Sequence, residues 1–182
     1  MRPGLTIKRD NMPQLLAATR ALTENGVFVG IPQSGDARED GKLGNADIGY
    51  LMENGIPERN VPARPHLVPG ARDAQARITD LLRQGARLAM EGRTEAVMRA
   101  LNAVGLTAQS SIRARIRAGI PPPLADSTIR ARARRGRKGA KRELARRAAG
   151  GAAGTTDVTP LIDTGQYIAA ITYVIRRLVG RR

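Results

Sequence analysis

The longest regular pattern of apolar positions runs from Gly70 to about Gly119 and predicts helical structure. Its apolar residues recur at steps of three and four, as they do along one face of an α-helix. Gly92 interrupts this stretch and either separates two helices or kinks one. The apolar positions form two sets, Ile78, Leu81, Leu82 and Leu88, followed by Val97, Leu101, Val104, Ala108, Ile112 and Ile116.

Shorter patterns on either side predict strands and one further helix. Leu5 to Arg9 alternates and predicts a short strand, and residues 12–22 have helical spacing after a cap at Asn11 and before a stop at Gly26. The compact run Val27–Ile31 predicts a buried strand. Near the other end, apolar residues alternate and predict a last strand, at Ile171, Tyr173 and Ile175.

These elements predict an α+β fold with a small mixed or antiparallel sheet packed on one long helix or helix pair. The length of 182 residues suggests one domain over residues 1–182. Only four residues are aromatic, so the core must consist of aliphatic side chains. Such a core is thin, and we expect neighbouring subunits to cover part of the apolar surface.

Polar and proline-rich segments connect these elements. Residues 33–44 are polar and rich in glycine, and we interpret them as a mobile loop. Asn45 is a candidate N-cap for a short helix over residues 46–54, which Gly55 ends. Residues 56–69 contain four prolines and predict an ordered extended segment without helix.

A strongly basic segment follows Pro121–Pro123, which end the long helix. Residues 130–147 contain ten Lys or Arg and a single acid, Glu143, and residues 148–156 have the composition of a flexible linker. We therefore expect 121–159 to be a basic, extended and partly flexible insertion. The candidates for contact with DNA or with a partner protein are Arg130, Arg132, Arg134, Arg135, Arg137, Lys138, Lys141 and Arg142.

The formal net charge of +15 favours contact with a polyanion, usually nucleic acid, although acidic protein surfaces fit as well. The basic segment lacks interleaved aromatic residues, so a DNA contact would involve only the phosphate backbone and would weaken with salt. The sequence leaves DNA and acidic protein partners open.

The sequence contains no recognisable catalytic constellation, metal site or cofactor site. There is no cysteine, and the only histidine is His66, for which a structural role is favoured over catalysis. Phosphate-loop, dinucleotide-binding and zinc-protease motifs are missing. No apolar run approaches the ~20 residues of a membrane span, and the N-terminus lacks a secretory signal. We expect a soluble protein, made in the cytoplasm, that is not an enzyme.

Three blocks of the sequence resemble the neck and tail-completion proteins of tailed bacteriophages. The first is Asn45-Ala-Asp-Ile-Gly-Tyr-Leu-Met-Glu-Asn-Gly55 followed by Val61-Pro-Ala-Arg-Pro-His-Leu-Val-Pro69. The second is Pro123-Leu-Ala-Asp-Ser-Thr-Ile129, and the third is Pro160-Leu-Ile-Asp-Thr-Gly-Gln-Tyr-Ile-Ala-Ala-Ile-Thr-Tyr173. Asn54 and His66 stand where the family often has Phe, which removes two aromatic anchors.

The resemblance implies a structural virion protein that forms a homo-oligomeric ring and joins the head connector to the tail tube around the DNA channel. A sixfold ring would match the tail and a twelvefold ring would match the portal. Such a ring needs a heterologous contact between copies. For that contact, or for the fold itself, the candidates are Pro62, Arg64, Pro65, His66, Asp163 and Thr164.

Within this set, Arg64 is a candidate for a fixed ion pair inside the subunit or across the interface, and Asp163 or Thr164 is a candidate cap for a helical turn. The alternative function is a sequence-independent DNA-binding protein that uses the arginine-rich segment. It predicts tight DNA binding by the isolated chain with a steep dependence on salt.

Overall fold

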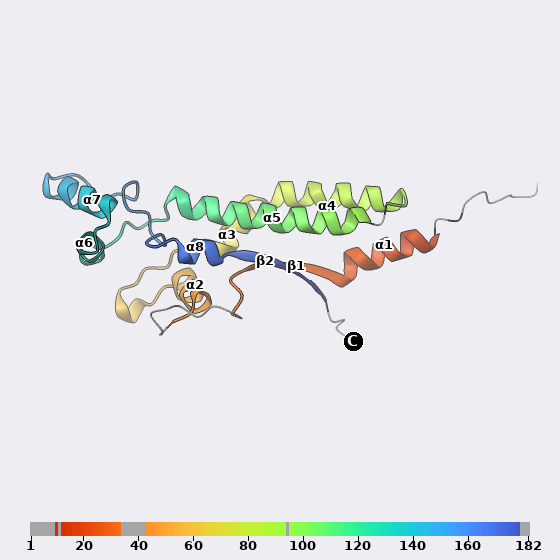
Figure 1. Cartoon of the computed structure of the whole chain (residues 1–182), viewed down its shortest axis with the longest axis horizontal. Helices are drawn as coiled ribbons and strands as arrows, with labels where there is room; N and C mark the ends of the chain where they lie inside the picture. The colour runs from red at the N-terminus through yellow and green to blue at the C-terminus, as the bar shows by residue number, and fades with distance from the viewer. Residues whose placement is uncertain (1–9, 11, 34–42, 94, 179–182) are drawn as a thin grey trace, which may run out of the picture. The chain divides into compact units, whose positions relative to one another are not determined.

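The structure is a computed structural model that describes residues 10, 12–33, 43–93 and 95–178 (Figure 1). The predicted strand Leu5–Arg9, the cap at Asn11 and most of the predicted loop 33–44 lie outside these residues. The described elements are α1 (Met12–Glu24), β1 (Asn25–Gly30), α2 (Asn45–Asn54), the 3₁₀ helix η1 (Pro57–Arg59), α3 (Leu67–Asp73), α4 (Gln75–Met90), α5 (Glu95–Ala118), α6 (Asp126–Arg134), α7 (Lys138–Ala148), α8 (Gln166–Ala170) and β2 (Thr172–Arg177).

The fold is α+β, as the hydrophobic pattern predicts. Strands β1 and β2 form a two-stranded antiparallel sheet, and the long helix α5 packs against it. The described residues group into two compact units, one drawn from the described parts of 1–28, 75–107 and 174–182, the other from those of 29–74 and 108–173. Helix α5 contributes residues to both units.

The first unit has a core of small aliphatic side chains. Ala18 of α1, Ala89 of α4 and Val97 and Leu101 of α5 are buried together, and Ile175 of β2 packs against them. Helices α4 and α5 approach closely here. A Cβ atom built on Gly85 would lie only 2.3 Å from the Cβ of Ala100, which is too close for any side chain at position 85. A glycine at position 85 is therefore what allows this close contact.

The second unit has a core centred on the last turns of α5. Ile112, Ile116 and Ile120 are buried together with Tyr167 of α8 and Ile171 just before β2. All six positions of the second predicted apolar set, Val97 to Ile116, are buried, so the periodicity identified the buried face of α5 correctly. Gly92 separates α4 from α5, with a positive φ of 88°.

The basic segment is folded, and the prediction of an extended, weakly ordered insertion over 121–159 is wrong. Helices α6 and α7 lie side by side as a hairpin (Figure 1). They enclose a small core of Ile129, Ala140 and Val158. The predicted flexible linker 148–156 is also held in place, since the amide of Gly151 donates to the carbonyl of Arg146 at 2.9 Å.

The proline-rich stretch 56–69 is only partly extended, which corrects another prediction. Residues 57–59 form η1, and α3 begins at Leu67. Pro69 is tolerated because it lies in the first turn of α3, where backbone N–H groups have no partner within the helix.

Two predicted helix ends also shift. Asn45 is the first residue of α2 and Gly44 is its N-cap, while the carboxylate of Asp47 accepts from the amide of Gly44 at 3.2 Å. Gly26 does not end α1, because the strand β1 already begins at Asn25.

Candidate functional site

The segment from Ala63 to His66 places alternate side chains on opposite faces. Arg64 and His66 are buried, whereas Ala63 and Pro65 are exposed. This alternation follows from the two-residue period of extended backbone. The segment therefore contributes one arginine and one histidine to the interior of the second unit.

Arg64 is held by backbone carbonyl groups. Its Nη1 donates to the carbonyl of Ile120 at 2.9 Å and to that of Pro122, and its Nη2 lies 3.5 Å from the carbonyl of Pro123. Arg64 has no carboxylate partner among the described residues, so the predicted ion pair is replaced by these carbonyl groups. Burial, and then the charge of Arg132, lower the pKa of Arg64.

His66 links three segments through its backbone and its ring. Its Nδ1 lies 2.7 Å from the carbonyl oxygen of Arg64 and 3.1 Å from a carboxylate oxygen of Glu53. Both neighbours are acceptors, so we assign the ring proton to Nδ1, and Nε2 accepts from the hydroxyl of Tyr167. Burial lowers the pKa of His66 and raises that of Tyr167, which favours the neutral form of both.

Glu53, the second-last residue of α2, caps α3 from outside that helix. Its carboxylate accepts from the amides of His66 at 2.8 Å, Leu67 at 3.0 Å and Val68 at 3.2 Å. Burial raises the pKa of Glu53, but these three hydrogen bonds outweigh that effect and lower it. The carboxylate thus supplies the capping interaction that α3 lacks from its own side chains.

Asp163 is the acidic centre for several arginines of the hairpin. It lies 2.8 Å from Arg135, 3.0 Å from Arg137 and 4.0 Å from Arg132. Arg132 is buried and also donates to the carbonyls of Thr159 and Ile162. These contacts attach the hairpin to residues 159–163.

Of the two alternative candidates for the cap of the turn before β2, Asp163 or Thr164, Asp163 is the one that pairs with these arginines. Gly165 is the N-cap of α8, and the hydroxyl of Thr164 lies 3.4 Å from the amide of Gln166. Thr164 is the nearer of the two to the predicted role.

Glu143 of α7 is a second acidic residue that pairs with several arginines, as Asp163 does. The carboxylate is 1% exposed and accepts from Arg146, Arg147 and the amide of Gly154. Burial alone would raise the pKa of Glu143, but the hydrogen bonds from Arg146, Gly154 and Arg147 lower it to about 2. The single acid of the basic stretch is thus a buried hydrogen-bonding centre.

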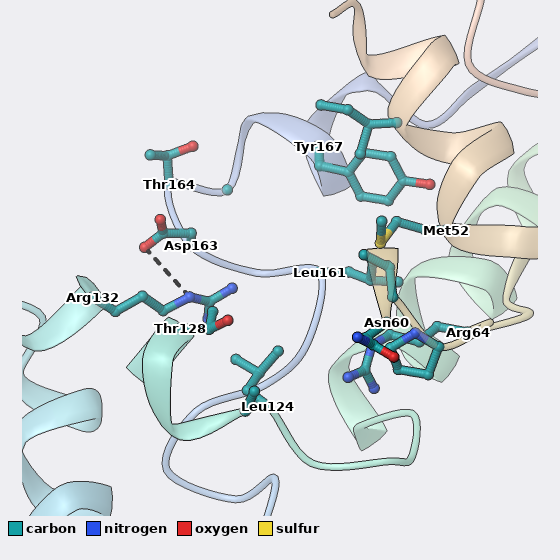
Figure 2. A pocket seen from close by; sticks show the side chains of 15 residues that line it. Met52, Asn60, Arg64, Leu124, Thr128, Arg132, Leu161, Asp163, Thr164 and Tyr167 are labelled. Carbon is teal, nitrogen blue, oxygen red and sulfur yellow. Dashed lines mark ion pairs between the residues drawn. The ribbon is translucent and has the colours of Figure 1, made fainter. Parts of the chain in front are cut away.

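A pocket of about 380 Å³ lies where these segments meet (Figure 2). Its walls come from α2, residues 60–64, the first part of α6 and residues 161–167. All of the lining residues except Asn60 and Arg132 belong to the three blocks that carry the family resemblance. Figure 2 shows Arg132 and Asp163 together on one side of the pocket and Arg64, Met52 and Tyr167 on the other.

The structure divides the predicted site residues into buried and exposed groups. Arg64, His66 and Arg132 are buried and bonded within the fold, so their side chains are not available to another molecule. Pro62, Pro65 and Thr164 are exposed, and their interface role stays a prediction. The remaining basic candidates are exposed on the hairpin, namely Arg130, Arg134, Arg135, Arg137, Lys138, Lys141 and Arg142.

Sequence reasoning missed the roles of three residues that organise these contacts, Glu53, Glu143 and Tyr167. For Glu143 a signal existed, because a lone acid three and four residues before Arg146 and Arg147 lies next to both on a helix. For Glu53 no local signal existed, since its partners come from a different helix.

The described part of the chain contains neither a cluster of metal-binding side chains nor a helix that could span a membrane. No group of three or more His, Asp or Glu side chains there is arranged to hold a metal ion. No described helix has the length and apolar content needed to cross a membrane.

Comparison with known proteins gives no match to this chain among family models, curated proteins or solved structures. The resemblance to the phage neck proteins therefore rests on the three sequence blocks alone.

Proposed function

We propose that this chain is a structural virion protein of a tailed bacteriophage. It forms a homo-oligomeric ring, sixfold or twelvefold, in the neck or tail-completion region, joins the head connector to the tail tube and surrounds the DNA channel. In this proposal the chain has no enzymatic activity.

The convergence of the three resembling blocks at one pocket carries the proposal. The blocks at 45–55 with 61–69, 123–129 and 160–173 are separated in the sequence, yet together they supply thirteen of the fifteen residues that line the pocket. A chance similarity of short segments gives no reason for them to meet in space. A shared fold gives such a reason, because the residues that determine a fold are in contact with one another.

Exposed apolar side chains support contacts between copies. Tyr50 of α2 is 71% exposed and Val68 of α3 is 53% exposed, and both belong to the first block. Met90, at the end of α4, is 66% exposed. Aromatic residues and Met are enriched where subunits meet, so these positions are suited to burial between neighbouring subunits.

Complementation of a phage that lacks this gene tests the proposal. Without the protein, filled heads and separate tails should accumulate, and a plasmid copy of the wild-type gene should restore joined particles. A Tyr50→Asp, Val68→Asp double variant should fail to restore them, whereas a matched double variant at exposed arginines, Arg20→Gln, Arg77→Gln, should succeed. Normal joined particles in the absence of the gene would contradict the proposal.

A sequence-independent DNA-binding protein is the second candidate, favoured by the net charge of +15. It predicts tight DNA binding by the isolated chain and no copies of the protein in purified particles. Internal pairing weakens this candidate, because Arg132, Arg135, Arg137, Arg142, Arg146 and Arg147 each have a carboxylate partner within the fold.

A further inference from the structure

The α6–α7 hairpin divides its basic residues into two classes. Seven arginines lie within 4.0 Å of a carboxylate of Asp126, Glu143, Asp157 or Asp163. Three residues, Arg134, Lys138 and Lys141, are exposed and have no carboxylate partner among the described residues. The charge of the first class is partly neutralised within the fold, whereas each residue of the second class keeps its full charge for another molecule.

The three unpaired residues flank the turn of the hairpin. Arg134 is the last residue of α6 and Lys138 is the first residue of α7, while Lys141 lies one turn further along α7. The turn between them contains Gly136, with a positive φ of 83°. Because α6 and α7 share a packed core, these cations are carried by a fixed framework.

The placement of the two lysines opposes folding. Lys138 and Lys141 are three residues apart on one helix, where like charges repel. They also lie in the first turn of α7, which has no acidic residue, and the helix dipole disfavours cations there. Folding alone gives no reason for two cations at these positions, whereas a negatively charged partner relieves both effects.

The residues around the turn distinguish between the classes of partner. Residues 134–141 read Arg-Arg-Gly-Arg-Lys-Gly-Ala-Lys, with no aromatic, amide or large apolar side chain. Protein interfaces depend on buried aromatic or large apolar anchors, and single-stranded nucleic acid is held by rings that stack on its bases. Cations without such residues fit a repeated phosphate backbone.

We infer that the tip of the α6–α7 hairpin, through Arg134, Lys138 and Lys141, contacts the phosphate backbone of duplex DNA. The inference rests on the proposed function for the source of that DNA, the genome passing through the neck. It adds to that function the residues that contact DNA and separates them from the arginines that maintain the fold.

Fluorescence anisotropy of a labelled random-sequence duplex with the full chain tests this inference. A triple variant, Arg134→Gln, Lys138→Gln and Lys141→Gln, should bind at least about tenfold more weakly at low salt. The slope of log affinity against log salt should become shallower by about 3, close to one for each lost phosphate contact. A wild-type chain that does not bind the duplex overturns the inference.

A matched control separates a local contact from net charge. The variant Arg20→Gln, Arg77→Gln and Arg117→Gln removes the same charge from exposed arginines that have no carboxylate partner among the described residues. It should keep nearly the wild-type affinity and slope. Equal losses in both triple variants would show attraction to the overall charge and would overturn the assignment to the hairpin tip.

The variant Lys138→Glu shows whether a loss of DNA affinity could come from misfolding. An acid at the start of α7 interacts favourably with the helix dipole, so the thermal midpoint should rise slightly. DNA affinity should fall in the same variant. Unchanged affinity would contradict the inference.

Failure of this inference is distinguishable from failure of the proposed function. A chain that is present in purified particles but does not bind the duplex retains the structural role and loses the DNA contact. A chain that binds through the hairpin tip but is missing from particles has the opposite outcome.

Discussion

Two arginine-rich regions of this molecule use the same side chain in opposite ways. At the pocket, Arg64 and Arg132 are buried, and their guanidinium groups donate to backbone carbonyls. At the hairpin tip, Arg134 is exposed and has no carboxylate partner among the described residues. The comparison teaches that the charge of a basic segment does not by itself indicate a polyanion partner. Only the basic residues that are not bonded within the fold are evidence for one.

Replacing Arg64 should have the largest effect on stability. Arg64→Met leaves the carbonyls of Ile120 and Pro122 buried without their donor, and we expect a loss of about 3 kcal/mol in the free energy of unfolding. Urea denaturation measures it. Arg134→Met, the exposed counterpart, should change stability by less than about 0.5 kcal/mol. Equal losses in the two variants would remove the distinction between the regions.

Glu143→Gln should have the next largest effect, because it removes the negative charge and one of the two oxygens that accept from Arg146 and Arg147. The pKa of Glu143 falls from an ordinary 4.5 to about 2 on folding. We expect a loss of roughly 2 kcal/mol at pH 7, a value reduced from the full shift because Arg146 is partly exposed and screened.

The pH dependence of that loss has a definite sign. A carboxylate with a lowered folded pKa stabilises the fold above its unfolded pKa, and this contribution is lost as the pH falls from about 4.5 to about 2. The difference in unfolding free energy between wild type and Glu143→Gln should therefore shrink over this range. A constant difference would show that the ionised carboxylate is not the stabilising group.

Tyr167→Phe should cost somewhat less, about 1.5 kcal/mol, since it leaves the buried Nε2 of His66 without a donor. Tyr50→Phe is the control, because that side chain is 71% exposed. Both are measured by thermal and urea unfolding. A similar effect of the two substitutions would exclude the buried hydrogen bond as the cause.

His66 adds a pH dependence of its own. Burial lowers its folded pKa below the ordinary 6.5, so the unfolded chain binds a proton first and stability declines as the pH falls below about 6.5. The chain contains a single histidine, so this decline should vanish in a His66→Gln variant. A decline that persists in the variant would have to come from another group.

The smallest effect is expected at an exposed ion pair of the hairpin. Arg142 lies 3.0 Å from Asp157, but its side chain is 69% exposed. Arg142→Gln should therefore cost about 0.5 kcal/mol or less, and less still in high salt. A loss as large as that of Glu143→Gln would show that surface pairs, too, hold the hairpin together.

The sequence predicts the parts of the fold whose patterns are local and rich in large apolar residues. Val97 to Ile116 repeat at helical spacing, and this pattern identifies the buried face of α5. The hairpin is not predicted because the buried apolar positions of α6 and α7, Ile129 and Ala140, are few and lie among arginines. Charge density alone then suggests an unfolded segment.

The organisation of the site depends on contacts between distant segments. Glu53 caps α3, and Arg64 bonds to carbonyls 56 to 59 residues away. No periodicity encodes such pairings, because their partners become neighbours only after folding. The resembling blocks indicate which segments matter, and the fold shows that they meet at one pocket.

Quantitative mass spectrometry of density-purified phage particles tests the proposed role most directly. A ring subunit of the neck predicts a small fixed number of copies in each particle, six or twelve, retained after high-salt washing. Absence of the protein from washed particles would contradict the account.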